Sequence, residues 1–335
     1  MTLLAESCAR RVEAGESLGR DEALGLLAAA AADPWPLWLA ADRVRRRFGG
    51  NTVHLCSIKA VKLGRCGEDC RWCAQSARWA TGIQAHGLVG GDELLAAARE
   101  AEAIRSTHFG LVSSGARLSD AEFDRVCEDV QVIRQNTRLE VCGSFGALTP
   151  ERAGRLVAAG VKRYNHNLET SARFFPQVCT SHTFDDRVRS ARAAVEAGME
   201  LCCGGLLGMG ETDEDRVDLA LAVRDVGSTV VPLNFLHPIP GTPLADAPPL
   251  EPVKILSIIA MFRLMLPGRI LKVAGGREKN LRSLQSLIFL AGADSIMIGN
   301  YLTTTGRPAE DDLAMIRDLG LECAPSRRDA ADGHA

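Results

Sequence analysis

Three closely spaced cysteines, Cys66, Cys70 and Cys73, are the residues whose types and spacing most clearly indicate chemistry. They follow an apolar, strand-like run and lie in a polar segment that contains glycine. Thiolates at this spacing can hold one corner of an iron-sulfur cluster or bind one zinc ion. A structural zinc ion needs a fourth protein ligand, and the nearest histidine downstream is His86. A 4Fe-4S cluster with three cysteine ligands leaves one iron open, so we favour it over zinc or unligated loop thiols.

A second polar group, Tyr164–Thr170, predicts a binding site. Asparagine, histidine and glutamate side chains crowd together there, which argues against a plain buried strand. The alternative is that these residues merely finish a strand. The glycine-rich segment Gly204–Glu211 lacks the lysine of a phosphate-binding loop, so we reject that interpretation.

Apolar runs alternate with amphipathic stretches from about residue 50 onward, and they predict the elements that position these residues. The strand-like runs are Val53–Ile58, His108–Ser113, Leu139–Phe145, Val161–Asn167, Met199–Gly204, Val230–Leu236, Ile270–Ala274 and Ser295–Gly299. The stretches with helical spacing are Asp92–Ile104, Asp120–Arg134, Pro150–Ala159, Phe184–Ala197, Glu214–Asp225, Pro252–Leu264 and Arg282–Ala291. This alternation predicts an α/β fold, a (β/α)8 barrel of the TIM type, with an open doubly wound sheet as the alternative.

The ends of the chain differ in pattern from this central region. Residues 1–45 predict an N-terminal helical extension, residues 46–323 the barrel, and residues 324–335 a flexible tail. Hydrophobic residues make up 46% of the chain and charged residues 24%, which is enough apolar material for one large core.

Charge and hydropathy exclude several classes of partner. The net charge of −3 provides no general attraction to nucleic acid. The best candidate for a membrane span, Ile255–Leu271, is interrupted by two arginines and a proline, and the N-terminal region lacks the apolar stretch of a secretory signal. We therefore expect a cytoplasmic protein without a nucleic-acid or membrane partner. In that reducing compartment, the eleven cysteines are expected to be metal ligands or core residues rather than disulfides.

The CxxxCxxC spacing, with Trp72 before the last cysteine, resembles the signature of radical S-adenosylmethionine (SAM) enzymes. Further motifs, in the same order over residues 50–322, resemble the biotin synthase family. These motifs are Leu55–Ile58, Cys66–Ser76, Tyr164–Thr170, Gly208–Thr212, Pro240–Leu244, Ala274–Glu278 and Gly299–Thr304.

The resemblance implies an enzyme that inserts sulfur between two unactivated carbons of dethiobiotin to make biotin. A 4Fe-4S cluster on Cys66, Cys70 and Cys73 would cleave SAM into methionine and a 5′-deoxyadenosyl radical, which abstracts hydrogen from the substrate. The resemblance also implies a homodimer, with reduced flavodoxin or ferredoxin as the electron donor.

The same resemblance assigns further residues to cofactor and substrate. Asn167 and Glu169 match positions that hold the adenosyl ribose, with glutamate in place of the usual aspartate. Arg187 matches the arginine that meets the SAM carboxylate, and a guanidinium suits that bidentate contact. Asn165 and Asn234 match positions that contact dethiobiotin. The alternatives are polar residues at a strand end, an arginine on a helix surface, and buried asparagines satisfied by backbone groups.

The sequence departs from the family pattern at a second cluster. In the family a 2Fe-2S cluster donates the sulfur and is bound inside the barrel by three cysteines and an arginine. Two of these cysteines match Cys142 and Cys202, but the third position is Gly110 and the arginine position is Lys272. Lysine is a poor replacement, because its ammonium group must lose a proton before it can ligate iron.

Other cysteines suggest how the missing ligands are replaced. Our hypothesis is that Cys56, Cys142 and Cys202, with Cys179 as a fourth, hold an altered auxiliary cluster, either 2Fe-2S or a four-iron variant. The first three lie on odd-numbered predicted strands, which share interior layers in such barrels. The alternative is that all four are small buried hydrophobic residues. For the whole protein, the alternatives are a related radical enzyme that does not insert sulfur, or a non-catalytic iron-sulfur or zinc protein.

Overall fold

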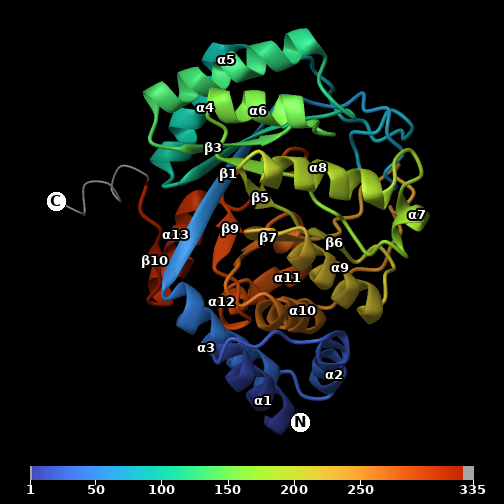
Figure 1. Cartoon of the computed structure of the whole chain (residues 1–335), viewed down its shortest axis with the longest axis vertical. Coiled ribbons are helices and arrows are strands. Elements are labelled where there is room, and N and C mark those ends of the chain that lie inside the picture. Colours follow the sequence, from blue (N-terminus) through green and yellow to red (C-terminus); the bar gives the residue numbers. More distant parts are fainter. Residues whose placement is uncertain (1, 327–335) are drawn as a thin grey trace, which may run out of the picture.

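Eight parallel strands close into a barrel in the computed structural model, which describes residues 2–326 (Figure 1). The pairing of His54 with Ser295 joins the first strand to the last, so the predicted (β/α)8 barrel is confirmed and the open sheet is wrong. Each of the eight predicted runs contains a strand. The strands are β1 (Thr52–Lys62), β2 (His108–Ser113), β3 (Glu140–Ser144), β4 (Arg163–Asn165), β5 (Glu200–Cys202) continued by β6 (Gly205–Leu207), β7 (Val230–Phe235), β8 (Ile270–Val273) and β9 (Ser295–Met297).

The fifth barrel strand is interrupted after β5, and both of its pieces pair with β7. Glycine permits the close approaches at this break, because a Cβ on Gly204 would lie 2.0 Å from the carbonyl oxygen of Pro232. A Cβ on Gly205 would lie 2.3 Å from the carbonyl oxygen of Glu169. The backbone of β6 therefore packs directly on the segment that follows β4, where Leu206 N donates to Glu169 O over 2.8 Å.

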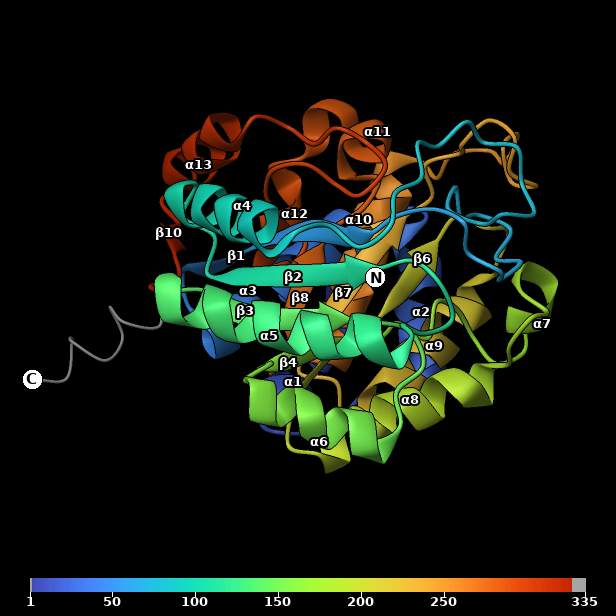
Figure 2. The ribbon, with the colours of Figure 1, turned by 90° about the horizontal axis from the view of Figure 1, so that it is seen from above.

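Helices form an outer layer around the strands (Figure 2). Several begin at side-chain caps, such as the reciprocal pair Ser119 and Glu122, or Thr149 before Pro150. The longer helices are α4 (Gly91–Ala103), α5 (Asp120–Asn136), α6 (Pro150–Ala159), α8 (Phe184–Glu196), α9 (Asp213–Asp225), α10 (Pro252–Met265) and α13 (Ala309–Asp318). Two short helices, α7 (Phe175–Val178) and α11 (Arg277–Leu281), lie in loops.

The predicted helix Arg282–Ala291 is broken into two pieces. A 3-10 turn covers Arg282–Leu284, and α12 covers only Leu287–Leu290. The φ angle of Arg282 is 53°, which lies outside the right-handed helical region and ends α11 at this point. A periodic apolar pattern continues through this backbone change, so periodicity alone could not reveal it.

Three N-terminal helices cover one face of the barrel: α1 (Thr2–Glu13), α2 (Arg20–Ala30) and α3 (Trp35–Gly49). Helix α3 packs on α10, where Trp38 Nε1 donates to Ser257 Oγ over 3.2 Å. Residues 255–265 of α10 are all buried. In the part of the chain that the structure describes, no helix is long and apolar enough to cross a membrane.

The C-terminal segment returns to the first strand. Strand β10 (Glu322–Cys323) pairs with β1 outside the closed barrel. Most of the tail predicted at residues 324–335 lies outside the described residues. At the other end α3 continues to Gly49, four residues beyond the predicted limit of the extension at residue 45.

Candidate functional site

The three-cysteine loop follows β1 at the carboxyl end of the barrel, the end that carries active sites in barrels of this type. Its fold is fixed by backbone hydrogen bonds, in which Cys66 N donates to Gln75 O over 2.9 Å and Cys73 N donates to Cys70 O over 3.1 Å. The loop also binds the end of α7, because Arg71 N donates to Val178 O over 3.0 Å. In Figure 2, α7 and the loops beyond β1 lie at the end toward which the β2 arrow points.

One cavity of about 280 Å³ joins the cysteine loop to the polar residues that sequence analysis singled out. Burial raises the pKa of Cys73 to about 11, so this thiol keeps its proton until a metal displaces it. The cavity is lined by all three loop cysteines, Cys66, Cys70 and Cys73, together with Asn165, Asn167, Glu169 and Arg187.

The two residues assigned to the adenosyl ribose have tightly fixed positions. Asn167 Oδ1 accepts from Gly204 N over 3.2 Å, which orients the amide. Glu169 has a φ of 70°, an uncommon conformation for a residue other than glycine. Burial raises the pKa of Glu169, although the nearby Arg187 guanidinium opposes that shift. The fifth-strand break described above therefore shapes this wall of the cavity.

Arg187 points from α8 into the same cavity. Its Nη1 atom donates to Asn167 O over 2.9 Å and lies 3.5 Å from Glu169 Oε1. Its Nε atom donates to His182 Nε2 over 3.0 Å. The arginine is therefore held at the cavity by two kinds of acceptor, which argues against a solvated residue on a helix surface.

The two candidate substrate asparagines differ in their partners. Asn165 lines the cysteine cavity, and its buried Oδ1 has no hydrogen-bond partner among the described residues. Asn234 lines an adjoining cavity of about 290 Å³. Its Nδ2 donates to Gly205 O over 3.1 Å and its Oδ1 accepts from Gly275 N over 2.9 Å. Asn165 thus has a buried acceptor without a partner among the described residues, whereas the amide of Asn234 stabilises the fold through two backbone hydrogen bonds.

Inside the barrel, three of the four other candidate cysteines lie together around Lys272. The Nζ atom of Lys272 is 3.7 Å from Cys56 Sγ and 3.5 Å from Cys202 Sγ. Burial raises the pKa of Cys142 to about 12, and the neighbouring Cys56 and Cys202 thiols add to the shift while Arg163 and Lys272 oppose it. The structure therefore brings Cys56, Cys142 and Cys202 into one group.

The glycine at the family's third cysteine position faces this interior. A Cβ on Gly110 would lie 3.0 Å from Ile58 Cγ2 and 3.5 Å from Asn165 Nδ2. Arg163 supplies a second cation, is buried, and forms an ion pair with Glu200 over 2.6 Å. Sequence reasoning missed Arg163, because nothing in a strand sequence marks one arginine as facing the barrel interior.

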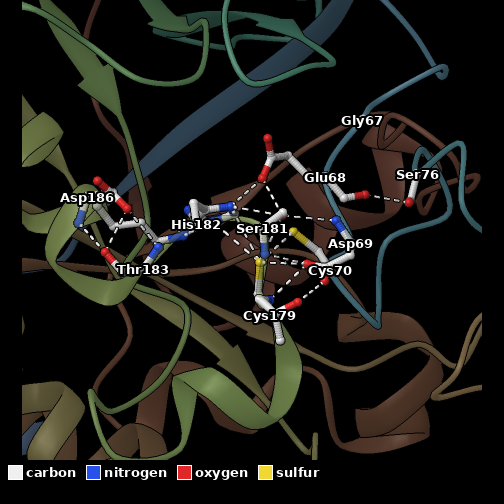
Figure 3. A network of polar contacts seen from close by, with 12 residues as sticks. Gly67, Glu68, Asp69, Cys70, Ser76, Cys179, Ser181, His182, Thr183 and Asp186 are labelled. Carbon is white, nitrogen blue, oxygen red and sulfur yellow. Dashed lines mark hydrogen bonds and ion pairs between the residues drawn. The ribbon is translucent and has the colours of Figure 1, made fainter.

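Cys179 does not join the interior thiols. It follows α7, and its Sγ lies 3.8 Å from Cys70 Sγ and 3.4 Å from His182 Nδ1 (Figure 3). Ligand atoms of Cys70, Cys179 and His182 lie within 4.8 Å of one another. This placement does not support Cys179 as the fourth ligand of the auxiliary cluster, because the segment after α7 packs against the cysteine loop instead.

His182 is a further residue that sequence reasoning missed. Its Nδ1 atom contacts Glu68 Oε2 of the cysteine loop, while its Nε2 atom accepts from Arg187. Arg187 Nε can only donate, so this contact requires a lone pair on Nε2 and places the ring proton on Nδ1. Hydrogen bonding with Cys179 raises the pKa of His182, whereas burial and the adjacent Arg187 charge favour the neutral ring that this contact needs. The partners of His182 lie on separate segments of the chain, so sequence spacing could not predict these contacts.

Models of two protein families match the chain. The Radical SAM superfamily model matches residues 61–223, and the Biotin and Thiamin Synthesis associated domain matches residues 232–322. The barrel, its three-cysteine loop and these matches define a radical SAM enzyme.

Curated relatives narrow the class to one family. Biotin synthase from Geobacter metallireducens is 49% identical over 317 residues, which cover 94% of this chain and 96% of the relative. Biotin synthase from Heliobacterium modesticaldum is 47% identical and covers 92% of this chain and 94% of the relative. The chain belongs to the biotin synthase family. Membership implies a 4Fe-4S cluster and SAM as cofactors and dethiobiotin as substrate.

Solved structures agree with the fold. Methylornithine synthase has a TM-score of 0.83 at 19% identity, with 97% of this chain and 99% of that chain covered. A maturase of the [FeFe]-hydrogenase has a TM-score of 0.82 at 15% identity, with 97% of this chain and 76% of that chain covered. At these identities the likeness concerns the barrel alone.

Proposed function

We propose that this chain converts dethiobiotin to biotin by radical sulfur insertion, with the residues assigned below. The observation that carries the proposal is the single cavity that joins the three-cysteine loop to Asn165, Asn167 and Arg187. A barrel mouth of this kind excludes competing reactants and fixes the distance between reacting atoms. Nearly full-length relatives named biotin synthase support the same activity.

Cys66, Cys70 and Cys73 are the proposed ligands of the 4Fe-4S cluster. The donor set fits that group, since three thiols at one cavity leave the fourth iron open to SAM. When bound and reduced, the cluster supplies the electron that breaks SAM into methionine and the radical that removes hydrogen from the substrate. Asn167 and Glu169 hold the ribose, and Arg187 binds the carboxylate of SAM through a charge-assisted contact.

Asn165 and Asn234 are the proposed contacts to dethiobiotin. The unpartnered Oδ1 of Asn165 supports a polar ligand at this point, because buried acceptors are rarely left unsatisfied. A ureido N–H group of dethiobiotin is a matching donor. Asn234 supports the proposal less strongly, since two backbone groups already hold its amide.

An altered auxiliary cluster on Cys56, Cys142 and Cys202 is the proposed sulfur donor. The Sγ atoms of Cys56 and Cys202 lie 3.7 Å and 3.5 Å from Lys272 Nζ, and a set of buried thiols is the type of donor that iron-sulfur clusters take. Lys272 and Arg163 place two cations beside the thiols. An ammonium group in that position offsets the negative charge of buried thiolates, so we propose charge compensation rather than ligation for Lys272.

An anaerobic incubation with dithionite, SAM and dethiobiotin, followed by mass spectrometry, tests this function. We expect both 5′-deoxyadenosine and biotin. Formation of 5′-deoxyadenosine without biotin would favour a radical enzyme that does not insert sulfur, a candidate that Gly110 and Lys272 keep open. Absence of both products would contradict radical catalysis and favour a non-catalytic metal-binding protein.

Three further proposals rest on the family resemblance. They are a homodimer, reduced flavodoxin or ferredoxin as the electron donor, and a cytoplasmic location. Size-exclusion chromatography with light scattering tests the dimer, and a mass of about 36 kDa per particle would contradict it.

A further inference from the structure

We propose that His182 is a positioning residue that holds Arg187 in its SAM-binding orientation and ties it to the cysteine loop. The inference rests on the proposed function, because it assumes that Arg187 binds the SAM carboxylate. It adds a residue and a coupling between the cluster loop and the cofactor site. The observation behind it is one imidazole whose two nitrogens contact Glu68 and Arg187.

The contact with Arg187 restricts the guanidinium plane. Arg187 Nε donates to His182 Nε2 over 3.0 Å, and Nη1 donates to Asn167 O over 2.9 Å. Two acceptors on different edges leave the planar group little freedom to rotate. The Arg187 side chain is only 13% exposed and the His182 side chain 20%, so water cannot readily replace the histidine acceptor. Loss of the histidine acceptor therefore releases the guanidinium from one of its two anchors.

The contact with Glu68 anchors the histidine itself. Glu68 lies between Cys66 and Cys70, and its Oε2 atom accepts from His182 Nδ1 and from Ser181 Oγ. The side chain that orients Arg187 is thus fixed by a residue within the metal-binding loop. A change in that loop on cluster loading is transmitted to the arginine through one imidazole.

A second set of hydrogen bonds holds the same two segments together. Asp69 Oδ1 accepts from Thr180 N over 2.9 Å and from Ser181 N over 3.0 Å. Asp69 and Ser181 lie beside each other in Figure 3. Thr180 Oγ1 also donates to Asp69 Oδ2. The segment that carries His182 is therefore attached to the cysteine loop at both Glu68 and Asp69.

Two substitutions separate the halves of this link. His182→Gln places an amide oxygen near the Nε2 position, where it can still accept from Arg187. His182→Asn places an amide nitrogen near the Nδ1 position, where it can still donate to Glu68 but leaves Arg187 without that acceptor. His182→Phe fills the volume and removes both contacts. His86→Ala is the matched control, because His86 is exposed and lies on another segment.

The measurement is the equilibrium dissociation constant of SAM on anaerobic, cluster-loaded protein with no reductant, so that binding is read without cleavage. Iron content and melting temperature are recorded for each variant. We expect His182→Asn and His182→Phe to weaken binding about tenfold, as loss of a hydrogen bond to a charged group does, and His182→Gln to stay within about threefold of the native protein. His86→Ala should have no effect.

Arg187→Ala distinguishes failure of this inference from failure of the proposed function. If Arg187→Ala leaves SAM affinity unchanged, the assigned role of Arg187 is wrong and the coupling has no basis. If Arg187→Ala weakens binding but His182→Asn and His182→Phe do not, only the inference is overturned. We expect the His182→Asn effect to disappear in the Arg187→Ala background. If His182→Asn weakened SAM binding in the Arg187→Ala background as much as in the native protein, the inference would also be overturned.

Discussion

Asn165 and Asn234 illustrate how single side chains divide between binding and folding. The Oδ1 atom of Asn165 is buried and has no partner among the described residues, whereas both ends of the Asn234 amide bind backbone groups. A buried acceptor without a partner costs free energy until a ligand supplies a donor. The two positions should therefore respond differently to the same substitution.

Asn165→Ala is expected to raise the KM for dethiobiotin about tenfold while the melting temperature stays nearly constant, because the native Oδ1 has no partner to lose. Asn234→Ala is expected to lower the melting temperature, because Gly205 O and Gly275 N lose their partners. Steady-state kinetics and thermal unfolding of the two variants check this contrast. Equal loss of stability in both would contradict it.

Residue types and spacing were enough to predict those parts of the site whose residues lie close together in the sequence. The Cys66, Cys70 and Cys73 loop needed only its spacing. Cys56, Cys142 and Cys202 needed strand order, which the alternation of elements supplied. Cys179 was grouped with the wrong thiols and His182 was missed, because both depend on how the loop after α7 packs on the cysteine loop. No periodic pattern records loop-to-loop packing.

At the scale of elements, the broken fifth strand shapes the cofactor wall. The gap between β5 and β6 lets the Asn167–Glu169 segment approach β6 at Gly205. A side chain at Gly205 would collide with Glu169 O at 2.3 Å and with Leu219 Cδ2 at 2.6 Å. The strand therefore depends on glycine for a contact that positions Glu169.

Gly205→Ala is expected to weaken SAM binding more than tenfold and to destabilise the protein by about 1–3 kcal/mol, because the added methyl group displaces the Glu169 backbone. Gly268→Ala is the control, since nothing lies within 4 Å of its Cβ. Binding titrations and chemical unfolding of both variants provide the test. Native affinity in Gly205→Ala would show that this contact does not position the site.

Elements with strong local signals were predictable, and those set by tertiary contacts were not. Helix α6 has its predicted bounds because Thr149 caps it and Pro150 begins it. The prediction of one continuous helix after α11 was wrong. The positive φ of Arg282 occurs at a residue that is neither glycine nor asparagine, so the sequence does not indicate it. The predicted run Met199–Gly204 likewise contains β5 but not β6, which lies in the glycine-rich segment that follows.

At the scale of the whole molecule, the N-terminal helices are part of the barrel's packing. Helix α10 is buried from Ile255 to Met265, with α3 across one side of it. Trp38 packs there and donates to Ser257. Because α10 is apolar on all sides, removal of α3 would expose a broad apolar surface on it.

Deletion of residues 1–49 is expected to give protein that aggregates or loses cooperative thermal unfolding, since it uncovers α10. Leu3→Ser is the control, because this side chain in α1 is 81% exposed. Soluble yield and calorimetry measure both. A truncated protein with native melting behaviour would show that the helices form a separable domain.

The barrel holds two groups of cysteines with separate proposed roles, radical initiation at its mouth and sulfur donation inside it. The most direct test of this division is the iron and sulfide content of anaerobically prepared protein, native and with Cys142→Ala and Cys202→Ala combined. We expect clearly more than about four irons per chain in the native protein, and about four in the double variant, which still cleaves SAM but makes no biotin. About four irons per chain in both proteins would contradict the account.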